Sequence, residues 1–398
     1  MNKYVIDGKS IDAIELKCLI ISRGIKVDKA VYQHHKNVAR LNASPLCCNC
    51  LLLSDGTIVQ LTDTNFHLRH LSSVFKWDNL RLLKYMGDLS TPFSLRMQND
   101  CAVLFYNNTE IETVTFPPVS GFYGQKTALG RPFIGNAVLQ GLDWVAFQCL
   151  WRCEYAAAGQ SCQFCFSGGD FENAAKRGKA LPQAVPQTDF ADIISYALKN
   201  DNISNVQITG GSTFDGHFEA THITEYLTVM PQVTGETLLY ITPPADLTLI
   251  DHYFELGASR IGCSIEVWDM TKANVITPGK VHLTGRDRHL RVLEYIAQKY
   301  GPGKAFSNFI IGIEDFSTLT EGATLLSERG ILPSASVWIP MGRPVLGSMK
   351  APDVDYYRQV KELFAELYSK YKLEPTKSRG LNVCIERHIW NYAEGNGK

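Results

Sequence analysis

The strongest constraint on the fold of this 398-residue chain is a regular alternation of short apolar segments with longer amphipathic segments, from about Asp143 onward. Apolar runs of strand length predict strands at 144–149, 205–211, 237–244, 260–268, 305–314 and 332–340. Apolar residues at helical spacing predict helices at 188–200, 222–230, 246–257, 288–301, 317–330 and 353–371. Strands that are apolar almost throughout and are separated by helices are typical of a parallel sheet covered on its faces by helices.

The positions of the unusual residues favour a barrel over the competing architecture, a doubly wound open sheet. These residues fall at or near the carboxyl ends of successive strands, and they include the cysteines after the first strand, Gly210-Gly211, Pro243-Pro244, Glu266, Gly312, Glu314 and Pro340. In a barrel the carboxyl ends of the strands converge on one mouth, which is where the active site lies. We therefore expect an α/β fold, a partial (β/α)6 TIM-like barrel.

Residues 1–140 lack this alternation and are expected to form an N-terminal α+β appendage. Helical patterns at 11–24 and 31–41 are followed by strand-like patterns at 56–63 and 101–116. A chain of this length usually exceeds what one core can hold. We expect an N-terminal α+β domain at 1–120, the barrel at 121–375 and a C-terminal tail at 376–398.

Charge and hydropathy narrow the class of partner. The 39 basic and 40 acidic residues leave a net charge of -1, and no run of one sign occurs. The sequence therefore predicts neither a nucleic-acid surface nor a membrane surface. The short apolar run CLII (18–21) is flanked by charges and is too short for a signal peptide or a membrane span, so we expect a cytoplasmic protein.

Three of the eleven cysteines lie close together, at Cys153, Cys162 and Cys165. In the cytosol thiols stay reduced, so clustered cysteines suggest a metal rather than disulfides. A closed tetrahedral zinc site takes four ligands, whereas a [4Fe–4S] cube held by three thiolates keeps one iron open. An open iron can bind a substrate or cofactor directly, which favours a catalytic cluster at the mouth of the barrel.

The cluster loop, CEYAAAGQSCQFC (153–165), resembles that of the radical S-adenosylmethionine (SAM) superfamily, biotin-synthase-like branch. Most members space their ligands CxxxCxxC, whereas eight residues separate Cys153 from Cys162 here. The longer spacing resembles a radical SAM family encoded near nitrilases. That family also has segments similar to TPGK (277–280) and YGPGKAFSNFIIGIE (300–314), and the likeness covers about residues 120–375.

The resemblance implies specific roles for residues of this chain. Cys153, Cys162 and Cys165 would bind the [4Fe–4S] cluster, and SAM would chelate its open iron. The SAM contacts implied are the backbone at Gly210, Gly211 and Ser212, the carboxylate of Glu266, the guanidinium of Arg286 and the backbone at Gly312. Ser212 and Thr213 replace the glutamate that the family's Gly-Gly-Glu motif carries, which is a departure from the pattern.

The implied function is that of an oxygen-sensitive radical SAM enzyme. It would cleave SAM to a 5′-deoxyadenosyl radical, which abstracts hydrogen from a small organic substrate, and it would need a low-potential electron donor of flavodoxin or ferredoxin type. From their positions near strand ends, the residues predicted to face the substrate are Gln207, Tyr240, Thr242, Asn308, Trp338 and Arg343.

Several alternatives remain open on the sequence alone. The chain could be a zinc-dependent TIM-barrel lyase or hydrolase, or a non-catalytic iron–sulfur protein. An auxiliary cluster could involve Cys47, Cys48, Cys50 and Cys384, although small buried thiols explain the first three as well. The glycine pair could simply form a tight turn, Arg288 or Arg291 could act in place of Arg286, and Cys149 and Cys263 are expected to pack as small apolar residues in the core.

Overall fold

The computed structural model describes residues 3–35, 50–62, 90–118, 120–133, 136–165, 178, 184–214, 216–340, 346 and 349–395. None of the helices within these ranges combines the length and the apolar character needed to cross a bilayer.

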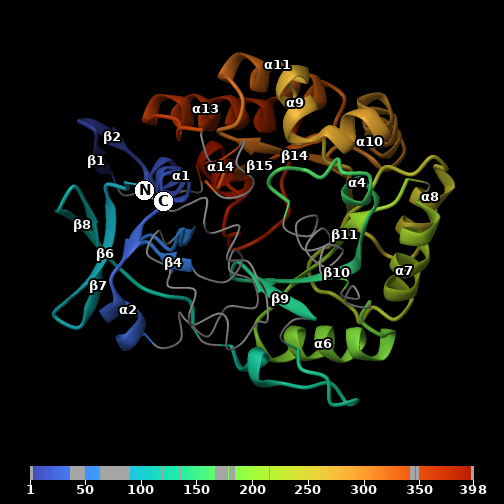
Figure 1. The fold of residues 1–398 in the computed structure, drawn as a ribbon, viewed down its shortest axis with the longest axis horizontal. Coiled ribbons are helices and arrows are strands. Elements are labelled where there is room, and N and C mark those ends of the chain that lie inside the picture. Colours follow the sequence, from blue (N-terminus) through green and yellow to red (C-terminus); the bar gives the residue numbers. More distant parts are fainter. Residues whose placement is uncertain are drawn as a thin grey trace.

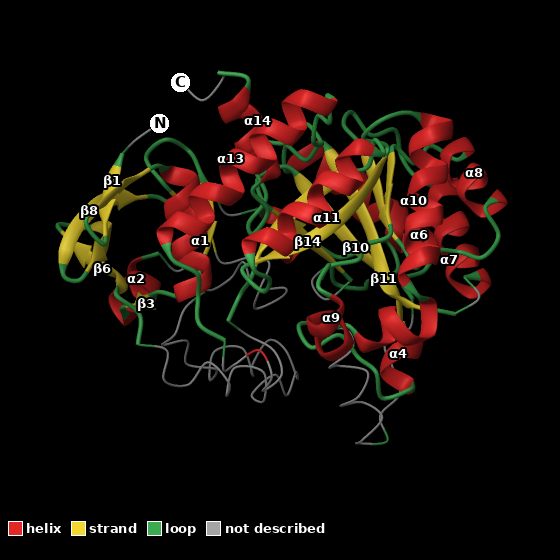
Figure 2. Cartoon of the chain, turned by 90° about the horizontal axis from the view of Figure 1, so that it is seen from above, coloured by secondary structure: helices red, strands yellow, loops and turns green. Residues whose placement is uncertain are grey.

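A curved seven-stranded sheet forms the main body, in the order β15-β14-β13-β12-β11-β10-β9 (Figures 1 and 2). Neighbouring strands from β10 to β15 all run parallel, and only the edge strand β9 runs antiparallel to its neighbour β10. The strands are β9 (Ala137–Gln140), β10 (Trp144–Cys153), β11 (Asn205–Ser212), β12 (Thr237–Tyr240), β13 (Arg260–Gly262), β14 (Ala305–Ile311) and β15 (Leu332–Val337). The expected partial (β/α)6 barrel is therefore confirmed, with one additional edge strand.

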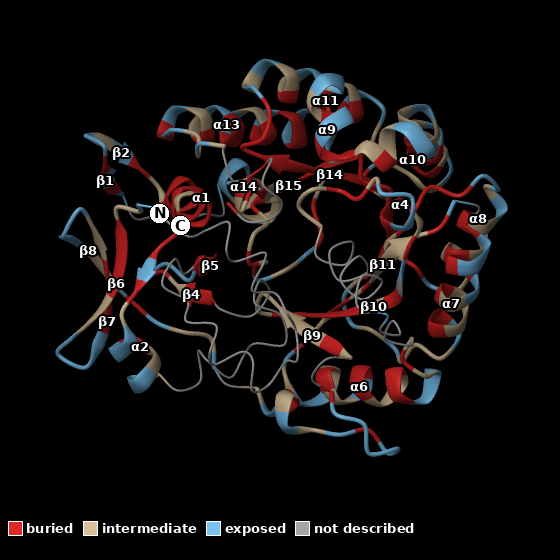
Figure 3. Ribbon diagram, viewed as in Figure 1, coloured by how far each residue is buried: buried red, intermediate tan, exposed pale blue. Residues whose placement is uncertain are grey.

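Helices cover the convex face of this sheet, as Figure 1 shows for the arc from α6 round to α13. Their inward faces are buried and their outward faces are exposed (Figure 3), which is the amphipathic pattern expected from the sequence. These helices are α6 (Gln187–Asn200), α7 (His217–Thr228), α8 (Thr248–Glu255), α10 (Arg286–Tyr300), α11 (Phe316–Glu328) and α13 (Val354–Tyr371). Shorter helical segments are η3 (Gly121–Gly124), α4 (Glu154–Ala157), α9 (Met270–Ile276), the π-helix η4 (Lys280–Thr284) and α14 (Glu386–Ala393).

The N-terminal part has its own small sheets beside the open side of the barrel (Figure 1). A four-stranded sheet has the order β3-β6-β7-β8, and two hairpins are formed by β1-β2 and β4-β5. The elements are β1 (Tyr4–Ile6), β2 (Lys9–Ile11), α1 (Ala13–Arg23), β3 (Lys26–Val27), α2 (Lys29–His34), β4 (Cys50–Leu52), β5 (Ile58–Gln60), β6 (Phe93–Gln98), β7 (Cys101–Tyr106) and β8 (Thr109–Val114). This α+β composition agrees with the expected appendage; the domain boundaries at 120 and 375 stay a prediction.

The segment before α14 links the two sides of the barrel sheet. At one edge, the amide of Val337 donates to the carbonyl of Val383 over 3.0 Å, and the amide of Ile385 donates to the carbonyl of Ala335 over 3.0 Å. In the turn that joins β9 to β10, at the other side of the sheet, the amide of Leu142 donates to the carbonyl of Gly380 over 3.2 Å. Residues 380–385 therefore pair with the β15 edge of the incomplete barrel and reach the β9–β10 turn at its other side.

Strands β12 and β13 end earlier than their apolar patterns predict, at Tyr240 and Gly262 instead of 244 and 268. Proline at positions 243 and 244 has no N–H group for a ladder, which ends β12. Glu266 therefore lies beyond the fourth strand rather than on it, in an isolated parallel bridge with Phe309. The apolar residues that follow these strands pack at the mouth instead of extending the sheet.

Candidate active site

The three cysteines of the loop lie at the carboxyl end of β10. Cys153 is the last residue of β10 and pairs with Ser212, the last residue of β11. Cys153 and Cys162 are buried, at 7% and 8% exposure, and Cys165 is half-buried. The amide of Cys165 donates to the carbonyl of Cys162 over 3.2 Å, and the amide of Gln160 donates to the carbonyl of Tyr155 over 2.8 Å, so the loop folds back on itself between the first and last cysteine.

Burial raises the pKa values of these thiols, whereas nearby hydrogen-bond donors and positive charge lower them. Burial raises the pKa of Cys153, while backbone hydrogen bonds from Ala156, Tyr155 and Ser212 act to lower it. Burial also raises the pKa of Cys162, and the positive charge of Lys280 opposes that shift. Metals bind the thiolate form, so backbone donors and a nearby cation are the surroundings that an iron–sulfur ligand requires.

The cluster loop is anchored to the segment after β13. The amide of Gln163 donates to the carbonyl of Ile276 over 2.8 Å. Phe164, the aromatic residue before the last cysteine, packs against a buried apolar group that includes Val267, Ile276 and Trp338. The QFC end of the loop thus has a packing role that positions Cys165.

Among the described residues, no set of three His, Cys, Asp or Glu side chains lies close enough together to hold one metal ion. Each thiolate of a [4Fe–4S] cube binds a different iron atom, so such a cluster does not need the tight convergence of a single-ion site. Cys149 and Cys263 are buried in the main apolar core, as expected, and burial raises the pKa of both thiols.

The glycine pair near the end of β11 is required by the packing of two strands. A Cβ atom at Gly211 would lie 1.7 Å from the carbonyl oxygen of Arg152, and one at Gly210 would lie 3.0 Å from the Cβ of Leu150. Glycine at these positions lets β11 approach the cysteine end of β10 closely. The structure therefore explains the pair by its contact with β10; its contact with SAM stays a prediction.

Glu266 lies in a polar network at the mouth. Its Oε1 accepts from Lys280 Nζ over 3.2 Å, and its Oε2 accepts from Asn308 Nδ2 over 2.7 Å. Asn308 Oδ1 in turn accepts from Ser336 Oγ over 2.8 Å. Glu266 has a φ of 73°, which is unusual for a residue with a side chain and costs energy that surrounding contacts must offset. Lys280 and Ser336 are network members that were not predicted as site residues.

Arg286 begins α10 and lies against the same segment. Its guanidinium donates to the carbonyl of Trp268 over 2.5 Å and stacks on the Trp268 ring, with 4.5 Å between Cζ and the ring centroid. Burial lowers the pKa of Arg286. Of the two alternatives, Arg288 donates to the carbonyl of Phe214 and Arg291 to the carbonyl of Ala245, over 3.0 and 3.2 Å. All three arginines therefore reach segments that follow barrel strands, and these contacts do not single out one of them.

The remaining predicted residues divide between the barrel interior and its rim. The rings of Tyr240 and Phe306 meet edge to face at 4.7 Å, and Gly262 leaves room for them, because a Cβ there would lie 2.2 Å from the Phe306 ring. Gln207 on β11 is half-buried. Gly312 follows β14 with a φ of 108°, and its amide donates to Tyr356 Oη over 3.2 Å. Arg343 lies outside the described residues.

Buried polar atoms at the strand ends that have no hydrogen-bond partner among the described residues include Thr213 Oγ1 after β11 and Trp338 Nε1 after β15. Thr213 is 1% and Trp338 2% exposed. Because buried polar groups are normally satisfied, a bound ligand at this end of the barrel would supply the missing partners. The three cysteine thiols fit an iron–sulfur cluster, and the buried polar atoms fit a polar cofactor beside it.

Two of the four cysteines suggested for an auxiliary cluster, Cys50 and Cys384, lie within the described residues. Cys50 lies in the β4–β5 hairpin opposite Gln60. Cys384 lies beside β15, with its Sγ 3.3 Å from Ser336 Oγ, so it adjoins the network of Glu266 and Asn308. Cys47 and Cys48 lie outside the described residues. An auxiliary cluster stays a prediction.

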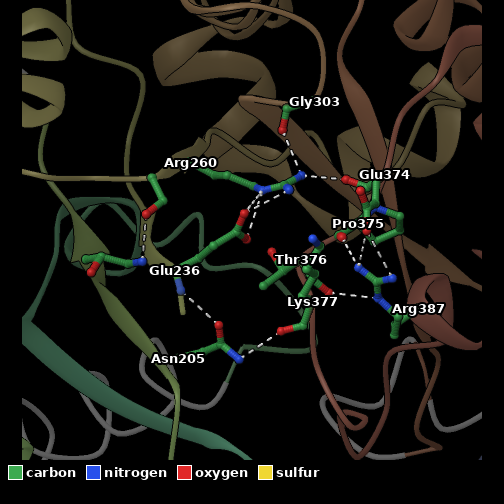
Figure 4. A network of polar contacts seen from close by, with 11 residues as sticks. Asn205, Glu236, Arg260, Gly303, Glu374, Pro375, Thr376, Lys377 and Arg387 are labelled. Carbon is green, nitrogen blue, oxygen red and sulfur yellow. Dashed lines mark hydrogen bonds and ion pairs between the residues drawn. The ribbon is translucent and has the colours of Figure 1, made fainter. Parts of the chain in front are cut away.

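The opposite end of the barrel has a structural network (Figure 4). Arg260 binds both oxygens of Glu236 at 2.9 to 3.1 Å and donates to the carbonyls of Gly303 and Glu374 at 3.1 and 2.7 Å. Asn205 donates to the carbonyl of Lys377 over 3.1 Å. These contacts tie the amino-terminal ends of the strands to the C-terminal segment and leave the carboxyl ends for chemistry.

Comparison with known proteins shows similarity to a named enzyme. No family model matches the chain. Over 261 residues the chain is 24% identical to the bacteriochlorophyllide c C-7(1)-hydroxylase of Chlorobaculum limnaeum. The similarity spans 62% of this chain and 65% of the hydroxylase, just under two thirds of that protein's length. By its name the relative is an enzyme, and the similarity supports the resemblance to the radical SAM superfamily that the cysteine loop indicates.

Two solved structures are similar to this chain, at low sequence identity and low TM-score. Streptococcus suis SuiB bound to the precursor peptide SuiA shares 13% identity with a TM-score of 0.39, and the match covers 62% of this chain and 49% of SuiB. HydG, a maturase of the [FeFe]-hydrogenase, shares 12% identity with a TM-score of 0.40, covering 63% of this chain and 58% of HydG.

Proposed function

We propose that this chain, which resembles the radical SAM superfamily in its cysteine loop and in its partial barrel, is a radical SAM enzyme acting on a small organic substrate. Cys153, Cys162 and Cys165 would hold a [4Fe–4S] cluster. When bound, the cluster and SAM would supply a 5′-deoxyadenosyl radical able to remove hydrogen from a carbon atom. The observation that carries the proposal is that three cysteines of one short loop lie at the mouth of the barrel, where β10 ends, with the Glu266 network and with buried polar atoms that have no partner among the described residues.

The protein's own groups would bind and orient SAM. The Glu266 carboxylate would accept hydrogen bonds from its ammonium or ribose hydroxyls, and the guanidinium of Arg286 would pair with its carboxylate. Gly210, Gly211 and Ser212 would offer backbone next to Cys153, with which Ser212 is paired. The positive φ at Gly312 favours glycine there, and its missing Cβ faces Pro352 and Tyr357, so its backbone would be the part that contacts adenine.

The substrate would enter the barrel interior above the Tyr240–Phe306 ring pair. Side chains able to orient it are Gln207, Tyr240, Thr242, Asn308, Trp338 and Arg343, which are mostly neutral and hydrogen-bonding. Hydroxylation of a carbon begins with breaking a C–H bond, so the name of the sequence relative agrees with hydrogen abstraction as the first step. A low-potential donor of flavodoxin or ferredoxin type would reduce the cluster.

Iron binding tests the assignment of the ligands. After anaerobic reconstitution with iron and sulfide, Cys153→Ala, Cys162→Ala and Cys165→Ala should each lose most of the bound iron and the brown colour. Cys149→Ala and Cys263→Ala are matched controls, since both thiols are buried in the core, and these variants should load like the wild type. Zinc without iron in the wild type would contradict the proposal and favour the zinc enzyme.

A further inference from the structure

The TPGK segment (277–280) packs against the cluster loop and is hydrogen-bonded to it. The amide of Gly279 donates to the carbonyl of Gln160 over 3.1 Å. A Cβ atom at Gly279 would lie 2.6 Å from the side chain of Tyr155 and 2.7 Å from that carbonyl oxygen, so only glycine fits. The hydroxyl of Tyr155 is also hydrogen-bonded to Thr284. The loop that carries the cysteines and the segment that carries Lys280 are therefore held together as one unit.

With the TPGK segment held against the cluster loop, the Lys280 side chain points into the mouth of the barrel. Its Nζ donates to the carbonyl of Ser264 over 2.6 Å and to Glu266 Oε1 over 3.2 Å. The side chains of Lys280 and Glu266 are only 18% and 13% exposed. Removing two charges from water is costly, and further hydrogen bonds must offset that cost, here from Asn308 to Glu266 and from Lys280 to Ser264.

Backbone geometry at this pair is also unusual. Lys280 begins a single-turn π-helix, a conformation that is frequent at functional sites. Glu266 has a positive φ although it is not glycine. Two unusual backbone conformations and a buried ion pair thus meet beside the cysteine loop.

We propose that Lys280 is a positioning residue of the candidate site, holding the Glu266 carboxylate for the cofactor and placing one positive charge beside the cluster thiolates. The inference rests on the proposed function. With Lys280 on Oε1 and Asn308 on Oε2, the carboxylate is fixed from two sides, and each oxygen keeps a further acceptor position for a ligand. A cation close to a negatively charged cluster favours its reduced form.

The test uses Lys280→Met and Lys280→Arg in the reconstituted full-length protein, with Lys272→Met as the control. Lys272 is a lysine on α9 that donates to the carbonyl of Ile313 and lies outside the Glu266 network. We expect Lys280→Met to shift the midpoint potential of the cluster to more negative values and to weaken SAM binding roughly tenfold, measured by the change in the electron paramagnetic resonance spectrum. Lys280→Arg should keep the potential near that of the wild type, and Lys272→Met should change neither quantity.

A double-mutant cycle with Glu266→Gln identifies the route of the effect. If Lys280 acts through Glu266, Lys280→Met should reduce SAM affinity much less in the Glu266→Gln background than in the wild type. The double variant lacks both charges, so it also shows whether Lys280→Met loses SAM affinity merely because it misfolds. The inference would be overturned by an equal loss of SAM affinity in the wild-type and Glu266→Gln backgrounds, or by an unchanged cluster potential in Lys280→Met, provided that the wild type takes up the cluster and binds SAM. A wild type that takes up no cluster would instead refute the proposed function.

Discussion

The contact between Gly211 and Arg152 leads to a quantitative prediction for Gly211→Ala. The new Cβ would lie 1.7 Å from the Arg152 carbonyl oxygen, and a contact of at least 3.0 Å is needed, so β10 and β11 must separate locally by about 1.3 Å (3.0 - 1.7). A ladder hydrogen bond of ~2.9 Å stretched by that amount is lost. One or two lost bonds at about 1 kcal/mol each, plus overpacking strain of about 1–3 kcal/mol, give a destabilisation of roughly 2–5 kcal/mol.

The assay is urea unfolding of Gly211→Ala, followed by iron uptake under conditions where the variant is still folded. Because Gly211 adjoins Ser212, the partner of Cys153, the variant should also bind less iron. Gly124→Ala is the matched control, since a Cβ at Gly124 meets nothing within 4 Å and it should change stability by less than about 0.5 kcal/mol. Equal urea midpoints and equal iron content for the two variants would refute the reasoning.

Two further predictions concern groups away from the cysteines. Arg260→Met should cost about 3 kcal/mol of stability by leaving Glu236 and two carbonyls at the barrel floor without their donor, measured by urea unfolding; a loss below about 1 kcal/mol would show that the floor network is dispensable. Burial raises the pKa of Glu219 from 4.5 to about 8. The protonated carboxyl therefore contributes fully to the free energy of unfolding below pH 4.5, and this contribution is lost as the pH rises through about 8. Glu219→Gln, which keeps an acceptor for the Thr242 amide, should therefore remove a decline of at most about 5 kcal/mol over that pH range, and identical pH–stability curves for the two proteins would contradict this.

The beginnings of the barrel strands could be predicted from the sequence. The apolar runs begin at Trp144, Asn205, Thr237, Arg260, Ala305 and Leu332, and the six parallel strands begin at the same residues. Their ends could not be predicted equally well, because apolar residues such as Val267, Ile313 and Trp338 pack beneath the cluster loop rather than in the sheet. Apolar character reports burial, and it does not distinguish a strand from the packed rim beyond it.

Spacing in the sequence predicts Cys153, Cys162 and Cys165 as cluster ligands, and the structure places their loop at the carboxyl end of β10; their role as ligands stays a prediction. Lys280 was not identified, although TPGK was noted, because a lysine near a strand end is ordinarily solvated and only the fold shows its ammonium between Ser264 and Glu266. Cys384 and Ser336 come together through pairing between segments about fifty residues apart, which no local pattern reports.

The central claim is best tested by anaerobic reconstitution with iron and sulfide, reduction in the presence of SAM, and assay for 5′-deoxyadenosine. The account predicts that the wild type forms 5′-deoxyadenosine and that Cys162→Ala, prepared in parallel, does not. A wild type that carries a full cluster and binds SAM but never cleaves it, with every candidate substrate and donor supplied, would contradict the account and favour a non-catalytic iron–sulfur protein.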